Sequence, residues 1–302
     1  MKKISFIIVN FNTKDILDKC VGNLINVYPE MEIIVVDNGS SDGSVEMVNE
    51  KYSDKVMLKA GENKGLAHGN NVGLDSSNGE YVVYLGTDAF PSSDAIKRLF
   101  EFMEENPETG IATPRLVLRD GSIDWDAHRG EMTPWSTLTH FAGLDKMFKS
   151  SKLLNQYHLG FYDLKTIHEI GACISHFMFV RREVFDKVGR WDEEFFLFGE
   201  DIDFCYRVKQ AGFKIMYVGD TEVLHYKGVT IMRKESSDIV TAANKNIKHR
   251  RFLKGETTRA MEHFVRKHLW KKYPSPILYL MILGIRLLTM VRLFLFDIKN
   301  RV

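Results

Sequence analysis

Residues 4–44 read ISFIIVNFNTKDILDKCVGNLINVYPEMEIIVVDNGSSDGS, and this stretch decides the fold. Its two apolar, β-branched runs, at 4–9 and 33–36, are typical of buried strands. Between them apolar residues recur at helical spacing, and Asn12 or Thr13 can cap a helix that runs to about Asn26. A strand, a helix and a strand joined by short connections predict two parallel strands covered by a helix.

The alternation of strands and helices continues along the chain. We expect further strands at residues 56–58, 81–85, 177–180 and 214–218, followed by a short run at 223–225. Helices are expected at residues 45–49, toward Leu74, at 183–188, and from Glu200 or Asp201 onward. The sequence therefore predicts an α/β fold with a mixed, mostly parallel sheet flanked by helices, followed by a C-terminal helical appendage.

Two regions depart from this pattern. Residues 119–170 are polar and show no clear periodicity, and we interpret them as an insertion beside the functional site, within a catalytic domain at 1–235. The predicted second region, 236–302, is basic. From Lys245 to the end the chain carries 14 Lys and Arg against 3 Asp and Glu, whereas the rest carries 27 against 37. An acidic body with a basic tail indicates a polyanionic partner, either a nucleic acid or a membrane surface.

The overall composition is that of an ordinary globular protein. With 302 residues, 44% hydrophobic and 27% charged, the chain can bury a core, and collagen-like, disordered and disulfide-framework classes are excluded. The three cysteines have no metal-ligand spacing and are interpreted as buried thiols in a reducing compartment. The apolar run after Lys2 and Lys3 is too short for a secretory signal, so we expect a cytoplasmic protein.

Polar residues follow three of the predicted strands. Asp37, Asn63 and Asp88 each come just after one, and ligands bind at this edge of parallel sheets, so these side chains should converge. The Asp88 carboxylate could hold Mg²⁺ or Mn²⁺ bridging a diphosphate. The alternative is a turn or helix-cap aspartate, because Pro91 and a helix follow closely.

Two later segments are further candidates for chemistry. Residues 191–203, WDEEFFLFGEDID, interleave carboxylates with aromatic residues ahead of a helix. Apolar surroundings raise the pKa of a carboxylate and can prepare it as a general base, although a capped helix beside a packed aromatic loop would read the same way. His225 ends a short strand, where it is either a structural residue or a second cation ligand.

These residues carry a resemblance to a known family. The motifs are FIIVNFN at 6–12, VVDNGSSDGS at 35–44, Asn63-Lys64-Gly65 to Asn70-Asn71, Gly86-Thr87-Asp88, Gly199-Glu200-Asp201-Ile202-Asp203 with Arg207, and His225. In order and spacing they resemble family 2 glycosyltransferases, specifically the rhamnosyltransferase-like branch, over residues 3–230. Each motif is short, and the specificity comes from six of them in the correct order.

The resemblance implies a GT-A fold and the inverting transfer of a sugar, rhamnose or another hexose, from a UDP- or dTDP-sugar. It implies a divalent cation, Mn²⁺ or Mg²⁺, held by Asp88 as the last residue of the family's Asp-x-Asp motif, with His225 close to the metal and diphosphate. It places Asp37 at the nucleotide base and makes Asp201 the catalytic base with Glu200 as its neighbour. The remaining nucleotide-side residues that it implies are Asn10, Asn12, Asn63, Gly65, Thr87 and Asn71, the last by packing the loop.

One position departs from the family. Gly86 stands where an aspartate is often found, which leaves one carboxylate in that motif, so His225 or the donor phosphates would have to complete the ligand shell of a metal. Two other classes stay open: a nucleotidyltransferase acting on a sugar phosphate, and a non-catalytic module that binds a nucleotide sugar. The products separate the three classes. A glycosyltransferase releases a nucleoside diphosphate and glycosylates the acceptor, a nucleotidyltransferase releases diphosphate, and a non-catalytic module binds the donor without turnover.

The C-terminal region carries an apolar run at 277–296 that is long enough to span a bilayer. On a helical wheel, polar residues gather on one side and apolar ones lie largely opposite: Arg286, Thr289, Arg292, Asp297 and Lys299 against Leu280, Leu283, Leu287, Met290 and Phe294. This segregation favours a helix lying in the interface, with the basic and aromatic residues at 266–273 at the headgroups. A spanning helix, and a helix packed on its own chain or in a homo-oligomer, are the alternatives.

The tail and the body together suggest the partners. We expect a protein held peripherally at the cytoplasmic face of an anionic membrane, whose saccharide acceptor is itself lipid-anchored, for example on a polyprenyl carrier. A nucleic acid is not expected as partner, because single-strand binding would leave the apolar run unexplained.

Overall fold

A computed structural model describes residues 4–227 and 247–300. The strands are β1 (Ile4–Asn10), β2 (Glu32–Asp37), β3 (Val56–Ala60), β4 (Tyr81–Leu85), β5 (Ala89–Phe90), β6 (Thr109–Leu118), β7 (Ile167–Glu169), β8 (Phe177–Arg181) and β9 (Lys214–His225). The helices are α1 (Lys14–Val27), α2 (Ser44–Tyr52), α3 (Leu66–Ser76), α4 (Ser93–Glu105), α5 (Pro134–Phe141), α6 (Leu144–Met147), α7 (Glu183–Val188), α8 (Glu200–Gln210), α9 (Ile247–Phe264) and α10 (Ser275–Asn300).

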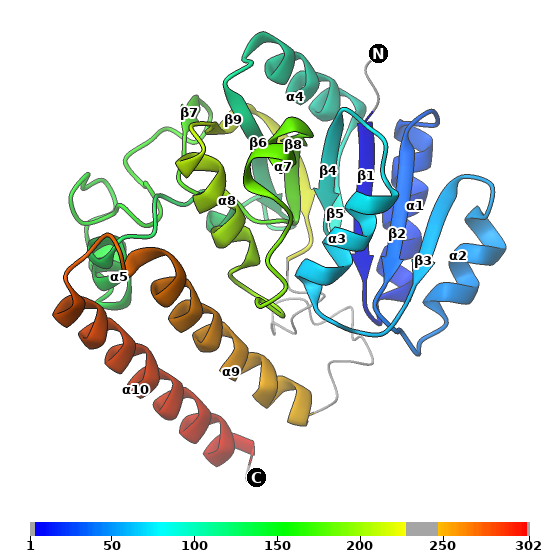
Figure 1. The fold of residues 1–302 in the computed structure, drawn as a ribbon. Coiled ribbons are helices and arrows are strands. Elements are labelled where there is room, and N and C mark those ends of the chain that lie inside the picture. The colour runs from blue at the N-terminus through cyan, green and yellow to red at the C-terminus, as the bar shows by residue number, and fades with distance from the viewer. Residues whose placement is uncertain (1–3, 228–246, 301–302) are drawn as a thin grey trace.

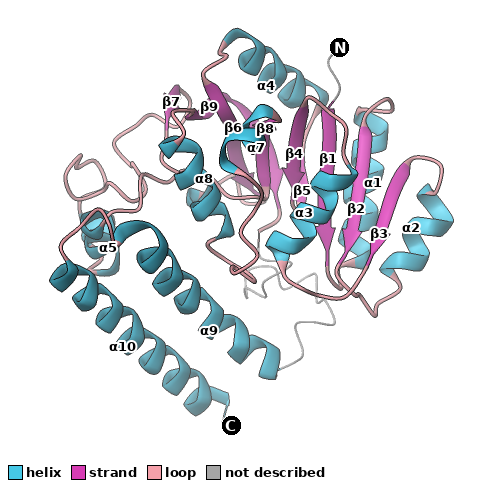
Figure 2. Cartoon of the chain, viewed as in Figure 1, coloured by secondary structure: helices cyan, strands magenta, loops and turns pink. Residues whose placement is uncertain are grey.

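The strands form one mixed sheet in the order β3-β2-β1-β4-β8-β6-β9-β5, with β7 paired to β9 (Figure 2). The N-terminal half is parallel, and its register sets Asn10 beside Asp37. Strand β8 runs antiparallel to both β4 and β6, while β6 and β9 are again parallel. The predicted fold class, a mixed sheet flanked by helices with a C-terminal helical appendage, is confirmed.

Two apolar cores cover the two faces of the sheet. Side chains alternate along a strand, so Phe6 and Ile8 of β1 join the core under α1, α2 and α4, whereas Ile7 joins the core under α3, α7 and α8. The helices lie on both sides of the sheet in Figure 1. All three cysteines are buried free thiols, as predicted.

Several elements differ from the sequence prediction. Residues 214–225 form one strand, β9, with an irregularity where it pairs β6, and the predicted break between 218 and 223 is wrong. The region 119–170 contains α5, α6 and β7. Neither predicted side chain caps α1: the Thr13 hydroxyl bonds to Asn10, and the Lys14 amide donates instead to Asp42 across the turn.

The C-terminal helices α9 and α10 pack against each other as a pair beside the sheet (Figure 1). A third apolar cluster joins this pair to the body through Phe195, which is 1% exposed and packs with residues of both helices. The predicted domain boundary at 235 and 236 lies outside the described residues.

Candidate active site

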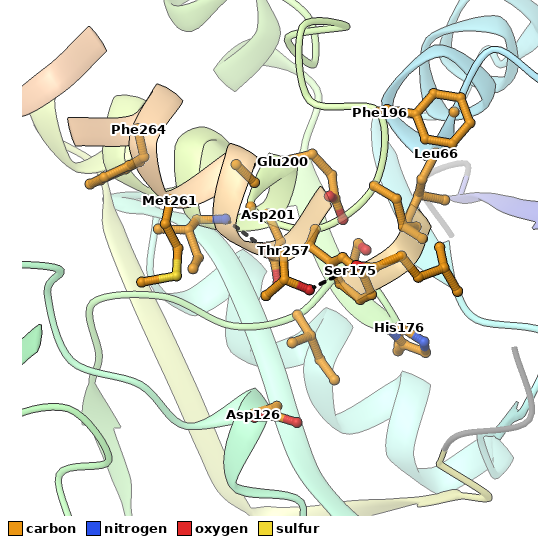
Figure 3. A pocket seen from close by; sticks show the side chains of 18 of the residues that line it. Leu66, Asp126, Ser175, His176, Phe196, Glu200, Asp201, Thr257, Met261 and Phe264 are labelled. Atoms are coloured by element: carbon orange, nitrogen blue, oxygen red, sulfur yellow. Dashed lines mark hydrogen bonds between the residues drawn. The ribbon is translucent and has the colours of Figure 1, made fainter. Parts of the chain in front are cut away.

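A cavity of about 740 Å³ opens at the carboxyl edge of the sheet and extends to α9 and α10. Seven of the residues selected from the sequence line it: Asn10, Asn63, Gly65, Thr87, Glu200, Asp201 and His225. Residues from β1, β4, β9 and the start of α8 therefore meet in one space. In Figure 3, Asp201 lies between His176 on one side and Met261 and Phe264 of α9 on the other.

Four of the selected residues lie behind the cavity wall. Asp37 is buried, and its carboxylate accepts hydrogen bonds from the Asn10 side chain (2.7 Å) and the Ser40 amide (2.8 Å). Asn12 accepts from the Ser41 amide at 2.8 Å. These contacts fix the turn after β2 and the side chain of Asn10.

Asn71 and Asp88 are the other two selected residues behind the cavity wall. Asn71 on α3 exchanges hydrogen bonds with the backbone of Trp191, at 3.0 Å in both directions, and thereby holds the aromatic loop against α3. Asp88 is completely buried directly after Thr87, which does line the cavity.

The aromatic loop closes over the start of α3 at a glycine. Gly65 has φ +99°, and a Cβ atom there would lie 2.4 Å from the backbone oxygen of Phe196. That same oxygen accepts a hydrogen bond from the Leu66 amide at 2.8 Å. Only glycine combines this backbone conformation with so close an approach. Phe196 and Phe198 line the cavity, whereas Trp191 and Phe195 are core residues, so the aromatic part of the segment 191–203 is divided between the cavity and the packed core.

A buried charge cluster surrounds Asp88. His225 Nε2 lies 3.4 Å from Asp88 Oδ1, and His225 Nδ1 lies 2.9 Å from Asp124 Oδ2. Asp124 also bonds to Lys227. A carboxylate at one ring nitrogen fixes the imidazole with its other nitrogen turned to Asp88, which is the arrangement that orients metal-binding histidines.

Charges in this cluster shift two pKa values in opposite directions. Burial opposes ionisation of Asp88, but the charge and hydrogen bonding of His225, together with the charge of His176, lower the pKa of Asp88 to about 2. Burial acts to lower the pKa of His225, whereas Asp88 and Asp124 together raise it to about 9. A cation at this place would compete with a proton on the imidazole.

The cluster contains buried polar atoms without hydrogen-bond partners, and these atoms could bind a divalent cation. Within the described residues, both carboxylate oxygens of Asp88 and the Nε2 atom of His225 are buried without a hydrogen-bond partner. Buried polar atoms rarely stay unpaired, because the loss of water costs about 1–3 kcal/mol each. Asp88, His176 and His225 each offer one ligand atom, and these atoms lie within 4.8 Å of one another.

Asp201 lies on the other side of the cavity at the N-terminus of α8, held by two donors. Arg129 donates to its Oδ2 at 2.6 Å, and the Ile202 amide donates to its Oδ1 at 2.8 Å. Burial acts to lower the pKa of the Arg129 guanidinium, but the adjacent Asp201 carboxylate raises it, so Arg129 stays charged. The pair is almost completely enclosed, with side chains 8% and 9% exposed.

His176 connects the two sides electrostatically. Burial lowers the pKa of His176, while the charges of Asp88, Asp124 and Asp201 all act to raise it. One imidazole is therefore close enough to sense carboxylates that are more than a hundred positions apart in the chain. The structure places Asp88 and Asp201 around one cavity, as the family resemblance implied.

Glu200, next to Asp201, is buried in the same wall. Burial, followed by the charge of Asp201, raises the pKa of Glu200 from 4.5 to about 8. Glu200 is therefore protonated near neutral pH. A protonated carboxyl in this wall can donate a hydrogen bond instead of accepting a proton.

We expect Glu200→Gln to flatten the pH dependence of stability. Below pH 4.5 the carboxyl is protonated in both the folded and unfolded chains; between about 4.5 and 8 only the unfolded chain ionises, so wild-type stability falls as pH rises. The variant lacks this loss. Melting temperatures measured from pH 5 to 8.5 should therefore shift in favour of the variant with rising pH. Parallel curves would show that Glu200 titrates normally.

Three residues of this site were missed by the sequence analysis. Arg129 and Asp124 lie in the region without periodicity, and each pairs with a residue 72 or 101 positions away. His176 immediately precedes β8, and no local sequence feature marks it as a site residue. The sequence pointed to this region only through the predicted insertion. The insertion supplies six residues to the cavity: Asp124, Asp126, Arg129, Met132, His140 and Tyr157.

Part of the predicted headgroup cluster faces the body instead. Lys267 bonds to Asp192 (2.5 Å) and Asp203 (2.6 Å), and His268 bonds to the same Asp203 at 2.6 Å. Burial opposes ionisation of Asp203, but His268 and the neighbouring cations lower the pKa of Asp203 to about 2. The prediction that these two basic residues lie at the headgroups is wrong, because they hold the tail on the acidic body.

Helix α10 presents an unpaired apolar face. The five predicted apolar residues are all exposed, with Leu280 at 69%, Met290 at 66% and Phe294 at 65%. On the polar side, Arg286 pairs with Glu262 and Asp297 pairs with Arg251, both on α9. Helix α10 is long and apolar enough to cross a membrane, and it is mostly exposed.

The model of the family "Glycosyl transferase family 2" matches residues 5–189. Among curated proteins, a low-salt glycan biosynthesis hexosyltransferase, Agl10, of Haloferax volcanii is 28% identical over 239 residues, covering 78% of this chain and 70% of the relative. An N-acetylglucosaminyl-diphospho-decaprenol L-rhamnosyltransferase of Mycobacterium tuberculosis is 25% identical over 236 residues, covering 69% of this chain and 71% of the relative.

Solved structures share the fold. GalNAc-T7 with UDP, GalNAc and Mn²⁺ superposes with a TM-score of 0.58 at 15% identity, over 87% of this chain and 48% of that one. The mannosyltransferase PcManGT of Pyrobaculum calidifontis, in complex with GDP-Man and Mn²⁺, superposes with a TM-score of 0.56 at 16% identity, over 93% and 69% of the two chains. At these identities the likeness is one of fold.

Proposed function

The chain belongs to glycosyl transferase family 2, and on that premise we propose that it transfers a sugar with inversion from a UDP- or dTDP-sugar to a hydroxyl of a lipid-linked saccharide. One observation carries the proposal. The cluster at Asp88 and the carboxylate of Asp201 border one cavity from two sides. The Asp88 side can therefore bind the leaving diphosphate, while Asp201 contacts the incoming hydroxyl.

Asp201 is the proposed general base. Inversion by a single displacement needs one carboxylate on the acceptor side and no covalent nucleophile. Arg129 and the Ile202 amide fix the orientation of the Asp201 carboxylate, and its neighbour Glu200 is uncharged near neutral pH. The hydroxyl proton would pass to Asp201 as the oxygen attacks the sugar.

Asp88 and His225 are the proposed cation ligands on the donor side. A bound Mn²⁺ or Mg²⁺ would neutralise charge on the departing nucleoside diphosphate. Asp124 holds the His225 ring in place, and Thr87 adjoins the same wall. Toward β1 and α3, Asn10, Asn63 and Gly65 border the space for the nucleotide, while Asp37, Asn12 and Asn71 shape it from behind.

The acceptor side of the cavity supports a lipid-linked substrate. From Asp201 the cavity extends to the C-terminal helices, where its lining combines the apolar side chains Met261, Phe264 and Ile285 with the basic side chains Arg250, Lys254 and Arg292. The mycobacterial relative is named for an acceptor with a decaprenol chain. One relative is named as a hexosyltransferase and the other as a rhamnosyltransferase, so the proposed donor sugar is rhamnose or another hexose.

The donor is identified by turnover. The full-length protein with Mn²⁺ is incubated with a panel of nucleotide sugars, including UDP- and dTDP-linked hexoses, and with a polyprenyl-linked saccharide. We expect one donor to release its nucleoside diphosphate in step with glycosylation of the acceptor. Release of inorganic diphosphate, or saturable binding without turnover of any donor, would contradict the proposal.

The tail is proposed to lie on a membrane rather than across it. Helix α9 runs beside α10 and carries Arg251, Arg259 and Glu262, so a bilayer that took in α10 would also meet these charges. A charge at mid-membrane costs about 2.5–3.5 kcal/mol on insertion scales. With the apolar face of α10 in the interface, the body would stay at the cytoplasmic surface, and regions 1–235 and 236–302 would act as catalytic and membrane-associating parts.

We expect the wild-type protein to float with vesicles rich in phosphatidylglycerol and to be released by alkaline carbonate. In Leu283→Asp/Leu287→Asp, both sites are more than half exposed, so folding is kept while flotation is lost. Met147→Asp/Leu153→Asp, at two apolar residues of the insertion that are even more exposed, is the matched control and should still float. Equal flotation of all three proteins would contradict a role for this face.

A further inference from the structure

A side chain at position 86 would occupy the space that the His176 ring fills. Strands β4 and β8 pair in antiparallel register with Leu85 opposite Phe177, and the Gly86 amide donates to the His176 carbonyl at 2.9 Å. The two residues are therefore direct neighbours at the end of the pair. A Cβ atom on Gly86 would lie 2.7 Å from Cδ2 and 3.2 Å from Cγ of the His176 ring.

The imidazole thus lies where a side chain at 86 would begin. That hypothetical Cβ would also be 3.0 Å from Asp88 Oδ1, so the space in question borders the Asp88 carboxylate. Since a Cβ contact below 3.0 Å forces a shift, an aspartate at 86 and the present His176 rotamer exclude each other. The glycine that removes one carboxylate from the motif is the residue that admits this ring.

The ring is also placed to bind. The centroids of the His176 and His225 rings lie 5.0 Å apart. One nitrogen of each ring and one Asp88 oxygen form a group within 4.8 Å. In the part of the chain that the structure describes, no protein hydrogen bond engages the His176 side chain, whereas Asp124 already holds His225.

We propose that His176 is a cation ligand that replaces the carboxylate missing at position 86, so that one carboxylate and two imidazoles hold the ion. This inference rests on the proposed function in assigning a divalent cation to the donor side. A site with two imidazoles carries less negative charge than one with two carboxylates. Imidazole is a good ligand for transition metals and a poor one for Mg²⁺, so the site should select Mn²⁺ over Mg²⁺.

The test measures Mn²⁺ binding to the full-length protein by electron paramagnetic resonance of the free ion, with no donor or acceptor present. His176→Phe fills the same space without a ligand atom and should weaken Mn²⁺ binding by at least about tenfold, the lower range for losing a supporting group at a metal site. His176→Ala should do the same. His68→Ala, at a histidine that pairs with Glu193 on the surface, is the control and should bind like wild type.

The exchange variant Gly86→Asp/His176→Ala moves the ligand to the other strand. We expect it to regain most of the Mn²⁺ affinity that His176→Ala loses, and Mg²⁺ to compete better in it than in wild type. Circular dichroism and melting curves confirm that each variant is folded. Wild-type Mn²⁺ affinity in both folded single variants, or an exchange variant no better than His176→Ala, would overturn the proposal. Because no sugar is present, either result is independent of whether transfer is found.

Discussion

Asp201→Asn should lower the transfer rate by about 10²–10⁴-fold, the usual contribution of a general base. The amide keeps the shape of the side chain and can still accept from the Ile202 amide, but it cannot take a proton from the acceptor. Donor affinity should change little, because Asp201 stands on the side of the cavity away from Asp88. Single-turnover rates and donor affinities, measured on the same preparation, separate the two effects.

This variant also weakens a buried ion pair, so stability must be followed. Losing one partner of such a pair can cost about 3–5 kcal/mol, because Arg129 would stay charged in a closed site. Asp220→Asn, at a partly exposed carboxylate that pairs with Arg98, makes the same chemical change on the surface and should keep wild-type transfer. Transfer by folded Asp201→Asn at the wild-type rate would remove Asp201 from the mechanism.

Asp88→Asn should abolish the part of donor affinity that depends on a divalent cation. The carboxylate is the single anionic ligand of the group with His176 and His225, and an amide binds Mn²⁺ far more weakly. We expect donor binding in Mn²⁺ to fall to the level that wild type shows with a chelator. Calorimetric titration of the donor, with Mn²⁺ and with chelator, measures both levels.

The chelator provides the internal control of this experiment. In the chelated state, wild type and Asp88→Asn should bind the donor alike, because the remaining contacts at Asn10, Asn63 and Gly65 are unchanged. Donor affinity that is the same in the variant and in wild type, with and without chelator, would show that Asp88 is a structural turn residue.

Local patterns in the sequence were sufficient for the framework. Apolar runs predicted β1, β2, β4 and β8 to within about one residue at each end, because buried strands read as continuous apolar stretches. The convergence expected for Asp37, Asn63 and Asp88 followed from one rule, that parallel strands end at a common edge. Asn63 lines the cavity, Asp37 and Asp88 lie buried behind its wall, and helix α8 begins at Glu200, one of the two predicted start residues.

Contacts between distant segments account for what was missed. Arg129 shows no local feature of a site residue, and its role becomes visible only when the insertion folds back onto α8. His176 is a neighbour of Gly86 through an antiparallel register that the sequence does not specify. All basic residues at 266–273 were predicted to face lipid headgroups, yet Lys267 and His268 bind Asp203 of the body. An acidic body and a basic tail can neutralise each other, and the sequence alone does not show which basic residues do so.

The position of the cation relative to Asp88 and Asp201 tests the proposed mechanism directly. Crystals of the full-length protein grown with Mn²⁺ and either UDP or dTDP would be measured at the manganese absorption edge. We expect one anomalous peak bonded to Asp88 and His225, with the nucleotide diphosphate beside it and Asp201 facing it across the same cavity. A fully occupied nucleotide with its manganese peak away from Asp88, or with Asp201 outside the nucleotide cavity, would contradict the proposed mechanism.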